Sequence, residues 1–145
     1  MKLFTIGFTQ TTAEAFFERL QSAGARCMVD IRLNRTSQLA GFAKFPDLAY
    51  FLDAVAGIGY RHEPLLAPTP DLFNAYKKKG GPWDVFVGGY KDLLDARDAA
   101  VHLAADDFKD ACLLCSEATA DHCHRSLAAD YLTQKWGRAV DIVHL

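Results

Sequence analysis

Short apolar segments typical of strands alternate with segments of helical periodicity along almost the whole chain of 145 residues. A strand, a helix and a second strand in succession form the right-handed crossover unit of a parallel sheet. The alternation therefore predicts one α/β domain, a three-layer (αβα), Rossmann-like fold with a mostly parallel sheet of about five strands. We expect strands at residues 3–6, 27–31, 58–62, 111–115 and 139–143, and helices at 11–23, 46–56, 83–105 and 127–136.

Local signals indicate where several of these elements begin and end. Thr11 followed by Glu14 is a capping box and predicts the start of the first helix, which Gly24 then ends. Gly88-Gly89 predicts a break in the long helical region, and Asp121 is the predicted N-cap of the last helix. Residues 63–82 are rich in Pro, Gly and Lys and are expected to be the least regular part of the chain.

Charge and apolar runs exclude some classes of protein. The formal net charge is only −2, which argues against a surface devoted to nucleic acid, although a local basic patch remains possible. The apolar run before Gly7 is too short for a signal peptide and no later run could span a membrane, so we expect a cytoplasmic protein without a membrane partner. Its four cysteines are then expected as free thiols, with Cys27 and Cys112 in the core.

The fold prediction also predicts where a ligand would bind. In open parallel sheets, ligands bind beyond the carboxyl ends of the strands. The loops at residues 7–10, 32–44, 62–70 and 116–125 should therefore meet at one edge of the sheet, and they contain much of the reactive chemistry in the sequence.

The segment from Cys115 to Arg125 is the strongest candidate site. Cys115 ends a predicted strand and Arg125 lies in the first turn of the following helix, so a positive helix end faces the thiol. Such a thiol has a lowered pKa and is a better nucleophile, while Arg125 could grip an anion. Glu117 could act as a general acid or base, and His122 or His124 could do the same near neutral pH.

Plainer interpretations of this segment remain open. Cys115 could be a buried structural thiol, and Glu117 with Arg125 could form a salt bridge that only orders the loop. Cys115 and Cys123 could form a redox pair. A metal ion is a further alternative to our expectation of no cofactor, although the seven residues between the cysteines are not the usual zinc spacing. Its candidate ligands are Cys115, Cys123, His122 and His124.

The second and third predicted strands end in polar residues that should face the same edge. Arg32 could contact a phosphate or nucleic-acid backbone, or it could simply pair with Asp30. The lysines at 77–79 lie among aromatic residues and could form a stacking surface for a single strand, but a solvated face is the preferred interpretation. The predicted anion-binding set is Asp30, Arg32, Arg35, Tyr60, His62 and Arg125, with Lys44 extending the positive charge.

Several of these motifs occur together in a known family. Cys115-x-Glu117, five further residues and Cys123-His-Arg-Ser126 resemble the signature of the bacterial and archaeal family called domain of unknown function 488. Val29-Asp-Ile-Arg32 resembles its second-strand motif, and further matches occur at Thr5-Ile-Gly7, at Tyr60-Arg-His62 and at Pro64-Leu65. The resemblance identifies relatives more than an activity, because the members are largely uncharacterised.

The chain departs from that family at one position. The family commonly places a His and then a Ser after Thr-Ile-Gly, where this chain has Phe8 and Thr9. If that His is essential in the family, this chain is altered or inactive. A more distant analogy of fold links the chain to rhodanese-like and cysteine-phosphatase domains, but nine residues separate Cys115 from Arg125, too many for their tight anion cradle.

Three functional hypotheses follow. The first is an enzyme acting on an anionic, phosphate-bearing, nucleotide or nucleic-acid substrate, with Cys115 as nucleophile or substrate contact, Glu117 and His124 in proton transfer, and an arginine clamp. The second is a nucleotide or nucleic-acid binding module without catalysis. The third is a metal-binding protein that uses the cysteines and histidines of the same loop. The sequence leaves the oligomeric state open.

Overall fold

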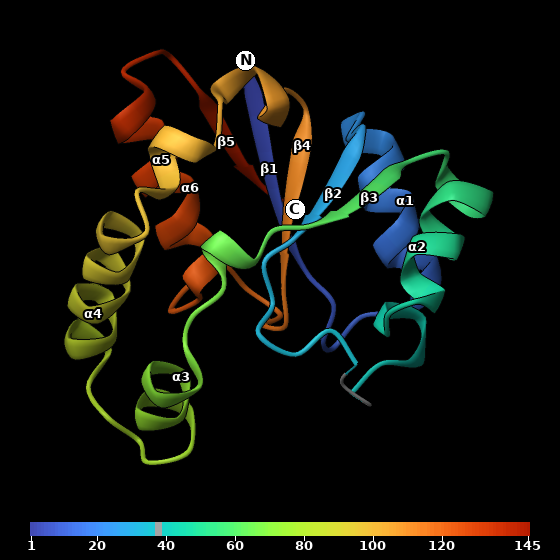
Figure 1. Cartoon of the computed structure of the whole chain (residues 1–145). Coiled ribbons are helices and arrows are strands. Elements are labelled where there is room, and N and C mark those ends of the chain that lie inside the picture. The colour runs from blue at the N-terminus through green and yellow to red at the C-terminus, as the bar shows by residue number, and fades with distance from the viewer. Residues whose placement is uncertain (37–38) are drawn as a thin grey trace.

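Five parallel strands form the centre of the protein (Figure 1) in a computed structural model that describes residues 1–36 and 39–145. Their order in the sheet is β3-β2-β4-β1-β5, and each neighbouring pair is parallel. The predicted α/β class is confirmed, and the sheet is entirely parallel. The strands are β1 (Lys2–Gly7), β2 (Cys27–Asp30), β3 (Gly59–His62), β4 (Ala111–Cys115) and β5 (Asp141–His144).

Helices cover both faces of this sheet. Figure 1 shows α1 and α2 on one side, and α4, α5 and α6 on the other. The α-helices are α1 (Ala13–Ala23), α2 (Asp47–Phe51), α3 (Pro70–Lys77), α4 (Trp83–Ala96), α5 (Ala99–His102) and α6 (His124–Trp136). Shorter turns are the 3₁₀ helices η1 (Gly41–Ala43), η3 (Pro64–Leu66) and η4 (Ala105–Phe108), and the π-helical turn η2 (Leu52–Ala56), which continues α2. None of the helices in the described ranges is long and apolar enough to cross a membrane.

Each inner strand sends alternate side chains into two separate cores, because successive residues of a strand point to opposite faces. The core beneath α1 and α2 includes Phe4, Ile6, Met28, Cys112 and Leu114. The core beneath α4, α5 and α6 includes Leu3, Val29, Ala111 and Leu113. Burial on both faces explains why these strands are nearly continuous runs of apolar residues.

Several of the predicted helix boundaries differ from the structure. The helix expected at 83–105 ends at Ala96 and is followed by α5 and η4, and residues 63–82, expected to be the least regular part, contain α3. Thr12, not Thr11, caps α1, and its hydroxyl accepts a hydrogen bond of 3.1 Å from the Ala15 amide. Gly24, with φ 78°, ends α1 as predicted. The predicted break at 88–89 is wrong, because α4 continues through both glycines and buries an apolar face on the sheet. The predicted N-cap at Asp121 is also wrong: Cys123 precedes α6, with no side-chain cap.

The carboxyl ends of the strands are tied together by their loops, as the fold prediction requires. The carbonyl oxygen of Ser116 accepts hydrogen bonds from the amide and the hydroxyl of Thr9, at 3.2 and 2.7 Å. The amide of Glu63 donates to the Asp30 carbonyl at 2.9 Å, so the loop after β3 joins the end of β2. Residues that are far apart in the chain thus surround one edge of the sheet.

Candidate functional site

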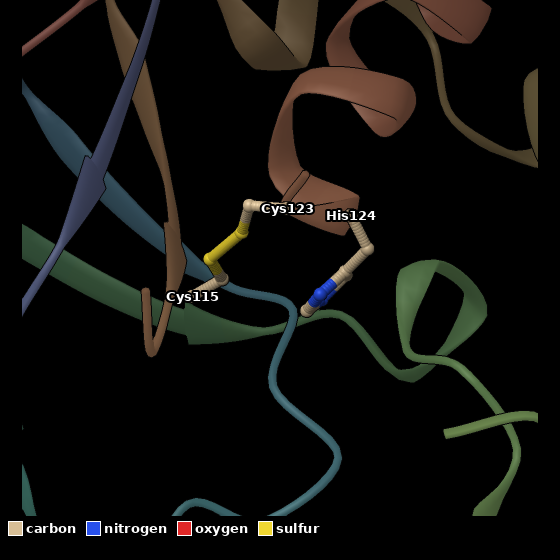
Figure 2. A group of neighbouring side chains, drawn as sticks. All are labelled: Cys115, Cys123 and His124. Carbon is tan, nitrogen blue, oxygen red and sulfur yellow. A yellow bond between two sulfur atoms is a disulfide. The ribbon is translucent and has the colours of Figure 1, made fainter. Parts of the chain in front are cut away.

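Cys115 and Cys123 are joined by a disulfide at this edge (Figure 2). The expectation of four free thiols is therefore wrong for this pair, while Cys27 and Cys112 are free. The loop after β4 folds back so that the start of α6 faces the end of the strand, which brings the two sulfurs together. Cys115 is fully buried and Cys123 is nearly so, as expected for a strand-end residue packed under a helix.

Arg125 is the buried charge beside this disulfide. Its Nη1 donates to the carbonyl oxygen of Glu117 at 2.6 Å and lies 3.7 Å from the sulfur of Cys115. Its Nε is buried without a hydrogen-bond partner among the described residues. Burial lowers the pKa of Arg125 below its ordinary value. The guanidinium therefore binds the main chain of the loop, whereas the sequence had suggested the Glu117 carboxylate as its partner.

The carboxylate of Glu117 instead forms an ion pair with Lys77 of α3. This contact joins the catalytic candidate Glu117 to the segment that we expected to be a solvated face. In the sequence, Lys77 is marked only by its position among aromatic residues. That pattern does not indicate a contact with the loop after β4. Lys77 therefore joins the candidate site, although it is absent from the set predicted from the sequence.

His124 contacts the end of β2 through its ring. Its Nε2 lies 2.9 Å from the carbonyl oxygen of Ile31, and because a carbonyl only accepts, Nε2 carries the proton. Burial lowers the pKa of His124 to about 4, so the ring is neutral at pH 7. His122 differs from it: the ring is exposed and stacks on Trp83, with centroids 4.8 Å apart.

A pocket lies between this segment and the helices α3 and α4. The space inside it that can hold solvent is only about 20 Å³, roughly enough for one water molecule, and its mouth is open to solvent. Aromatic rings from α3 and α4 form one wall and the site segment forms the other. Its lining residues are Phe73, Tyr76, Lys77, Trp83, Phe86, Cys115, Ser116, Glu117, His122, Cys123 and His124. A second hollow adjoins it and shares Phe73, Ser116 and His124, with Arg32 and Asn34 in its lining.

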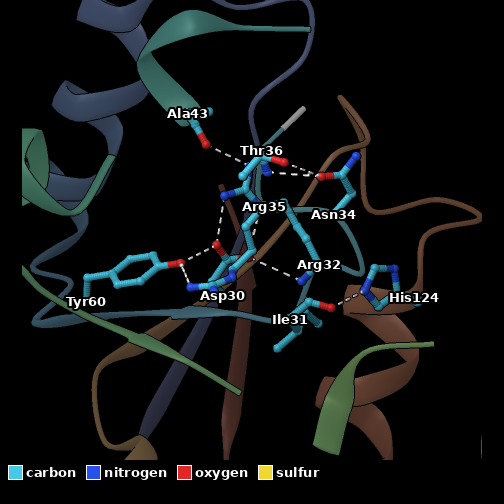
Figure 3. A network of polar contacts seen from close by, with 9 residues as sticks. All are labelled: Asp30, Ile31, Arg32, Asn34, Arg35, Thr36, Ala43, Tyr60 and His124. Atoms are coloured by element: carbon cyan, nitrogen blue, oxygen red, sulfur yellow. Dashed lines mark hydrogen bonds and ion pairs between the residues drawn. The ribbon is translucent and has the colours of Figure 1, made fainter. Parts of the chain in front are cut away.

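Asp30 and Arg32 form the other polar cluster of the edge (Figure 3). Nε and Nη2 of Arg32 donate to the two carboxylate oxygens of Asp30, and Nη1 donates to the Ala43 carbonyl at 2.7 Å. The hydroxyl of Tyr60 donates to Asp30 at 2.6 Å, and burial together with this hydrogen bond raises the pKa of Tyr60 to about 12. Each guanidinium nitrogen of Arg32 therefore already has a protein acceptor.

The remaining predicted anion-binding residues extend this cluster away from α6. Arg35 donates to the Tyr60 hydroxyl at 3.4 Å and lies over the ring of Phe45 at 4.2 Å. His62 is exposed at the end of β3, opposite Asp30 in the sheet register, and partial burial followed by the charge of Arg35 lowers its pKa. Lys44 ends η1 on the same loop. In Figure 3, Tyr60 and His124 lie at opposite ends of the network.

The fold and this edge define an α/β protein with an all-parallel sheet and a cysteine-, histidine- and arginine-containing site at the carboxyl ends of its strands. The family described as "Domain of unknown function DUF488" matches residues 12–132, so the chain belongs to it and the predicted resemblance is confirmed. No curated protein and no solved structure matches the chain.

Phe8, where the resemblance leads one to expect a His, is part of the packing at this edge. It is buried, and the Arg32 guanidinium carbon lies 5.2 Å from the centroid of its ring. An aromatic ring at this distance attracts a cation through its quadrupole. Phe8 therefore supports the Asp30–Arg32 pair and supplies no proton-transfer group.

Proposed function

We propose that this protein is an enzyme acting on a small anionic substrate in the aromatic pocket, with the sulfur of Cys115 as nucleophile or direct substrate contact. The observation that carries the proposal is the 3.7 Å contact between Arg125 Nη1 and the Cys115 sulfur at the pocket wall. A fixed positive charge beside a sulfur stabilises the thiolate and lowers the pKa of the thiol. Reduced Cys115 is therefore expected to be an activated nucleophile.

The composition of the pocket supports an anionic substrate with a flat portion. Lys77 lines it as the ion-pair partner of Glu117, and α6 begins at its wall without a side-chain cap, so the positive end of the helix dipole faces it. Phe73 and Tyr76 contribute rings to the pocket lining, and Trp83 already stacks on Phe86 and on the exposed ring of His122, so a planar group could stack on Trp83 by replacing His122. A phosphate-bearing molecule with a base or similar ring combines both features, and it would lie across the open mouth of the pocket, because the space inside holds only about one water molecule.

Two residues of the pocket could move protons. Glu117 lines the pocket with its carboxylate paired to Lys77, and His124 lines it with a neutral imidazole. Both types of group serve as general acids or bases when they reach the substrate. Arg32, with its nitrogens engaged by Asp30 and Ala43, is assigned the role of holding the end of β2 beside them.

The test is the alkylation rate of each cysteine in reduced protein, with a chelator present and the products resolved by peptide mass. At pH 6–7 we expect Cys115 to react roughly ten times faster than free cysteine, because a greater fraction is thiolate. We also expect a higher ratio of iodoacetate to iodoacetamide reactivity than free cysteine gives, because the pocket attracts an anion. Inorganic phosphate should slow the reaction of Cys115.

Two variants complete this test. Lys77→Gln should lower the preference of Cys115 for iodoacetate over iodoacetamide. Lys109→Gln should leave this preference unchanged, because Lys109 lies just before β4 and so at the opposite edge of the sheet. The proposal fails if Cys115 reacts no faster than free cysteine, or if its preference between the two reagents equals that of free cysteine.

A nucleotide-binding protein without catalysis is the second candidate, favoured by the aromatic wall. Trp83 stacks on Phe86, with centroids 5.4 Å apart, and Lys77 stands beside them. Stacking of bases on such rings is tolerant of sequence. If a nucleoside monophosphate binds and protects Cys115 from alkylation, yet the reactivity of Cys115 without ligand equals that of free cysteine, this second candidate replaces the first.

A further inference from the structure

Cys115, Cys123 and His124 form a cluster whose potential ligand atoms all lie within 4.8 Å of one another (Figure 2). Two thiolates and one imidazole are a known ligand set for Zn²⁺ sites that leave one coordination position open. We infer that, once its disulfide is reduced, the protein binds a thiophilic divalent cation such as Zn²⁺ through these three residues. This inference goes beyond the proposed function and does not rest on it.

The spacing of the backbone suits a shared ion. The Cα atoms of Cys115 and Cys123 are 7.5 Å apart, and reduction frees the two sulfurs to separate. Ligand atoms around a tetrahedral Zn²⁺ lie roughly 3.5–3.8 Å from one another, given bonds of about 2.3 Å to sulfur and 2.0 Å to nitrogen. The potential ligand atoms already lie within 4.8 Å of one another, so we expect rotation of the three side chains to reach this arrangement.

The neighbours of the cluster provide the outer contacts that metal ligands use. The carbonyl of Ile31 accepts from Nε2 of His124, which leaves the lone pair of the neutral ring on Nδ1. Arg125 Nη1 points at the Cys115 sulfur and can donate to it as a thiolate. The charge of the two thiolates offsets that of the ion, so the buried Arg125 meets a cluster that is neutral overall.

The open position of such an ion would face the aromatic pocket, because all three ligands line it. Water or the anionic group of a bound molecule could occupy that position, with Glu117 and His122 on the same lining. The seven-residue gap between the cysteines does not resemble zinc motifs. The fold compensates for it by placing the end of β4 against the start of α6.

Metal binding requires two steps, reduction of the disulfide and release of the thiol protons. A phosphine reductant cleaves the disulfide, takes up an oxygen atom from water as it is oxidised, and leaves two thiols. The cation then displaces one proton from each thiol, and both protons go to solvent. A metal ion bound here would occupy the sulfur of Cys115, which the proposed function requires as a free thiol. A chelator should therefore convert the metal-bound form into the thiol-reactive form.

The test is a titration of reduced, metal-free protein with Co²⁺. We expect one ion per chain, with the near-ultraviolet charge-transfer band of cobalt bound to thiolate, and its displacement by Zn²⁺. Cys115→Ser and Cys123→Ser should each weaken binding at least about tenfold and reduce that band. Cys27→Ser, which changes a cysteine outside the cluster, is the matched control and should leave binding unchanged.

A measurement on the wild-type chain keeps the inference testable if a variant fails to fold. Zn²⁺ should slow alkylation of Cys115 and Cys123 at least tenfold without affecting Cys27. Absence of a charge-transfer band, or unchanged alkylation of Cys115 in Zn²⁺, overturns the metal site. Fast, anion-selective alkylation of Cys115 in chelator, together with no cobalt binding, would overturn the metal site and leave the proposed function intact. Cobalt binding together with alkylation of Cys115 no faster than that of free cysteine would overturn the proposed function and leave the metal site intact.

Discussion

Asp30 and Arg32 form a two-point ion pair, with Nε–Oδ1 and Nη2–Oδ2 distances of 2.8 and 2.7 Å, and neither side chain is more than 2% exposed. Buried pairs of this kind add little net stability, but the loss of one partner leaves an uncompensated charge. The pair therefore fixes the end of β2 and makes the packing beside the site depend on both residues.

Replacing Asp30 tests this dependence. Asp30→Asn should lower the free energy of unfolding by about 3–5 kcal/mol, because it leaves the Arg32 guanidinium buried without a counter-charge. Urea unfolding measures the change, and the double variant Asp30→Asn/Arg32→Met should recover much of it. Tyr60→Phe removes only one hydrogen bond to Asp30 and should lower stability by about 1 kcal/mol. A loss below 1 kcal/mol in Asp30→Asn would show that the pair is not structural.

Position 7 has no room for a side chain, because Gly7 packs directly against the loop after β4. A Cβ at this position would collide with the Glu117 carbonyl oxygen and with Nη1 of Arg125. Gly7→Ala should therefore destabilise the protein by about 3 kcal/mol in urea unfolding, at the upper end for overpacking, because a backbone atom must move. Gly41→Ala, which meets no atom within 4 Å, is the control and should change stability by less than about 0.5 kcal/mol.

The two glycines in α4 should respond differently to alanine. Gly88→Ala meets nothing within 4 Å and should raise the free energy of unfolding by about 0.5–1 kcal/mol, since alanine favours a helix interior. A Cβ on Gly89 would lie 2.8 Å from Cδ1 of Leu72, so Gly89→Ala should give less or none of that gain. Thermal unfolding of both variants measures the difference; equal gains would contradict the packing of α3 on α4.

The depressed pKa of His124 predicts how stability depends on pH in metal-free protein. The ring titrates at about 4 in the folded state and near 6.5 when unfolded, so the unfolded chain takes up the proton first. Its contribution to stability is complete above about pH 6.5 and declines as the pH falls towards 4, by up to about 3 kcal/mol. Urea unfolding across this range should show a shallower slope for His124→Gln. Parallel curves would indicate that His124 titrates normally.

The fold could be predicted from the sequence because its elements are separated by strong local signals. The run Ala111–Cys115 is apolar on both faces, which suits a strand buried in a parallel sheet, and Gly24 marks a helix end with a left-handed backbone. The errors occurred where packing overrode local preference. Gly88 and Gly89 lower helix propensity, yet the buried face of α4 keeps the helix intact.

That the candidate residues meet at one edge of the sheet could be predicted, but their contacts with one another could not. Strand-end position was enough to place Arg32 and Cys115 there. The acceptor of Arg125 depends on how the loop after β4 folds back. The contact of Lys77 with Glu117, 40 residues apart in the sequence, depends on how α3 packs. Spacing along the chain contains no information on such contacts, and for the same reason the seven-residue gap concealed the proximity of Cys115, Cys123 and His124.

The central place of β4 in the sheet constrains the order in which the chain can fold. β1 pairs only with β4 and β5, so the first strand to be synthesised has neither partner until the chain has passed residue 110. β2 and β3, by contrast, can pair early. Long-range pairing of this kind is slow to form. Because Cys115 is the last residue of β4, the strand that joins β1 to β2 also carries this cysteine, so a chain halted before that point would have neither a continuous sheet nor Cys115.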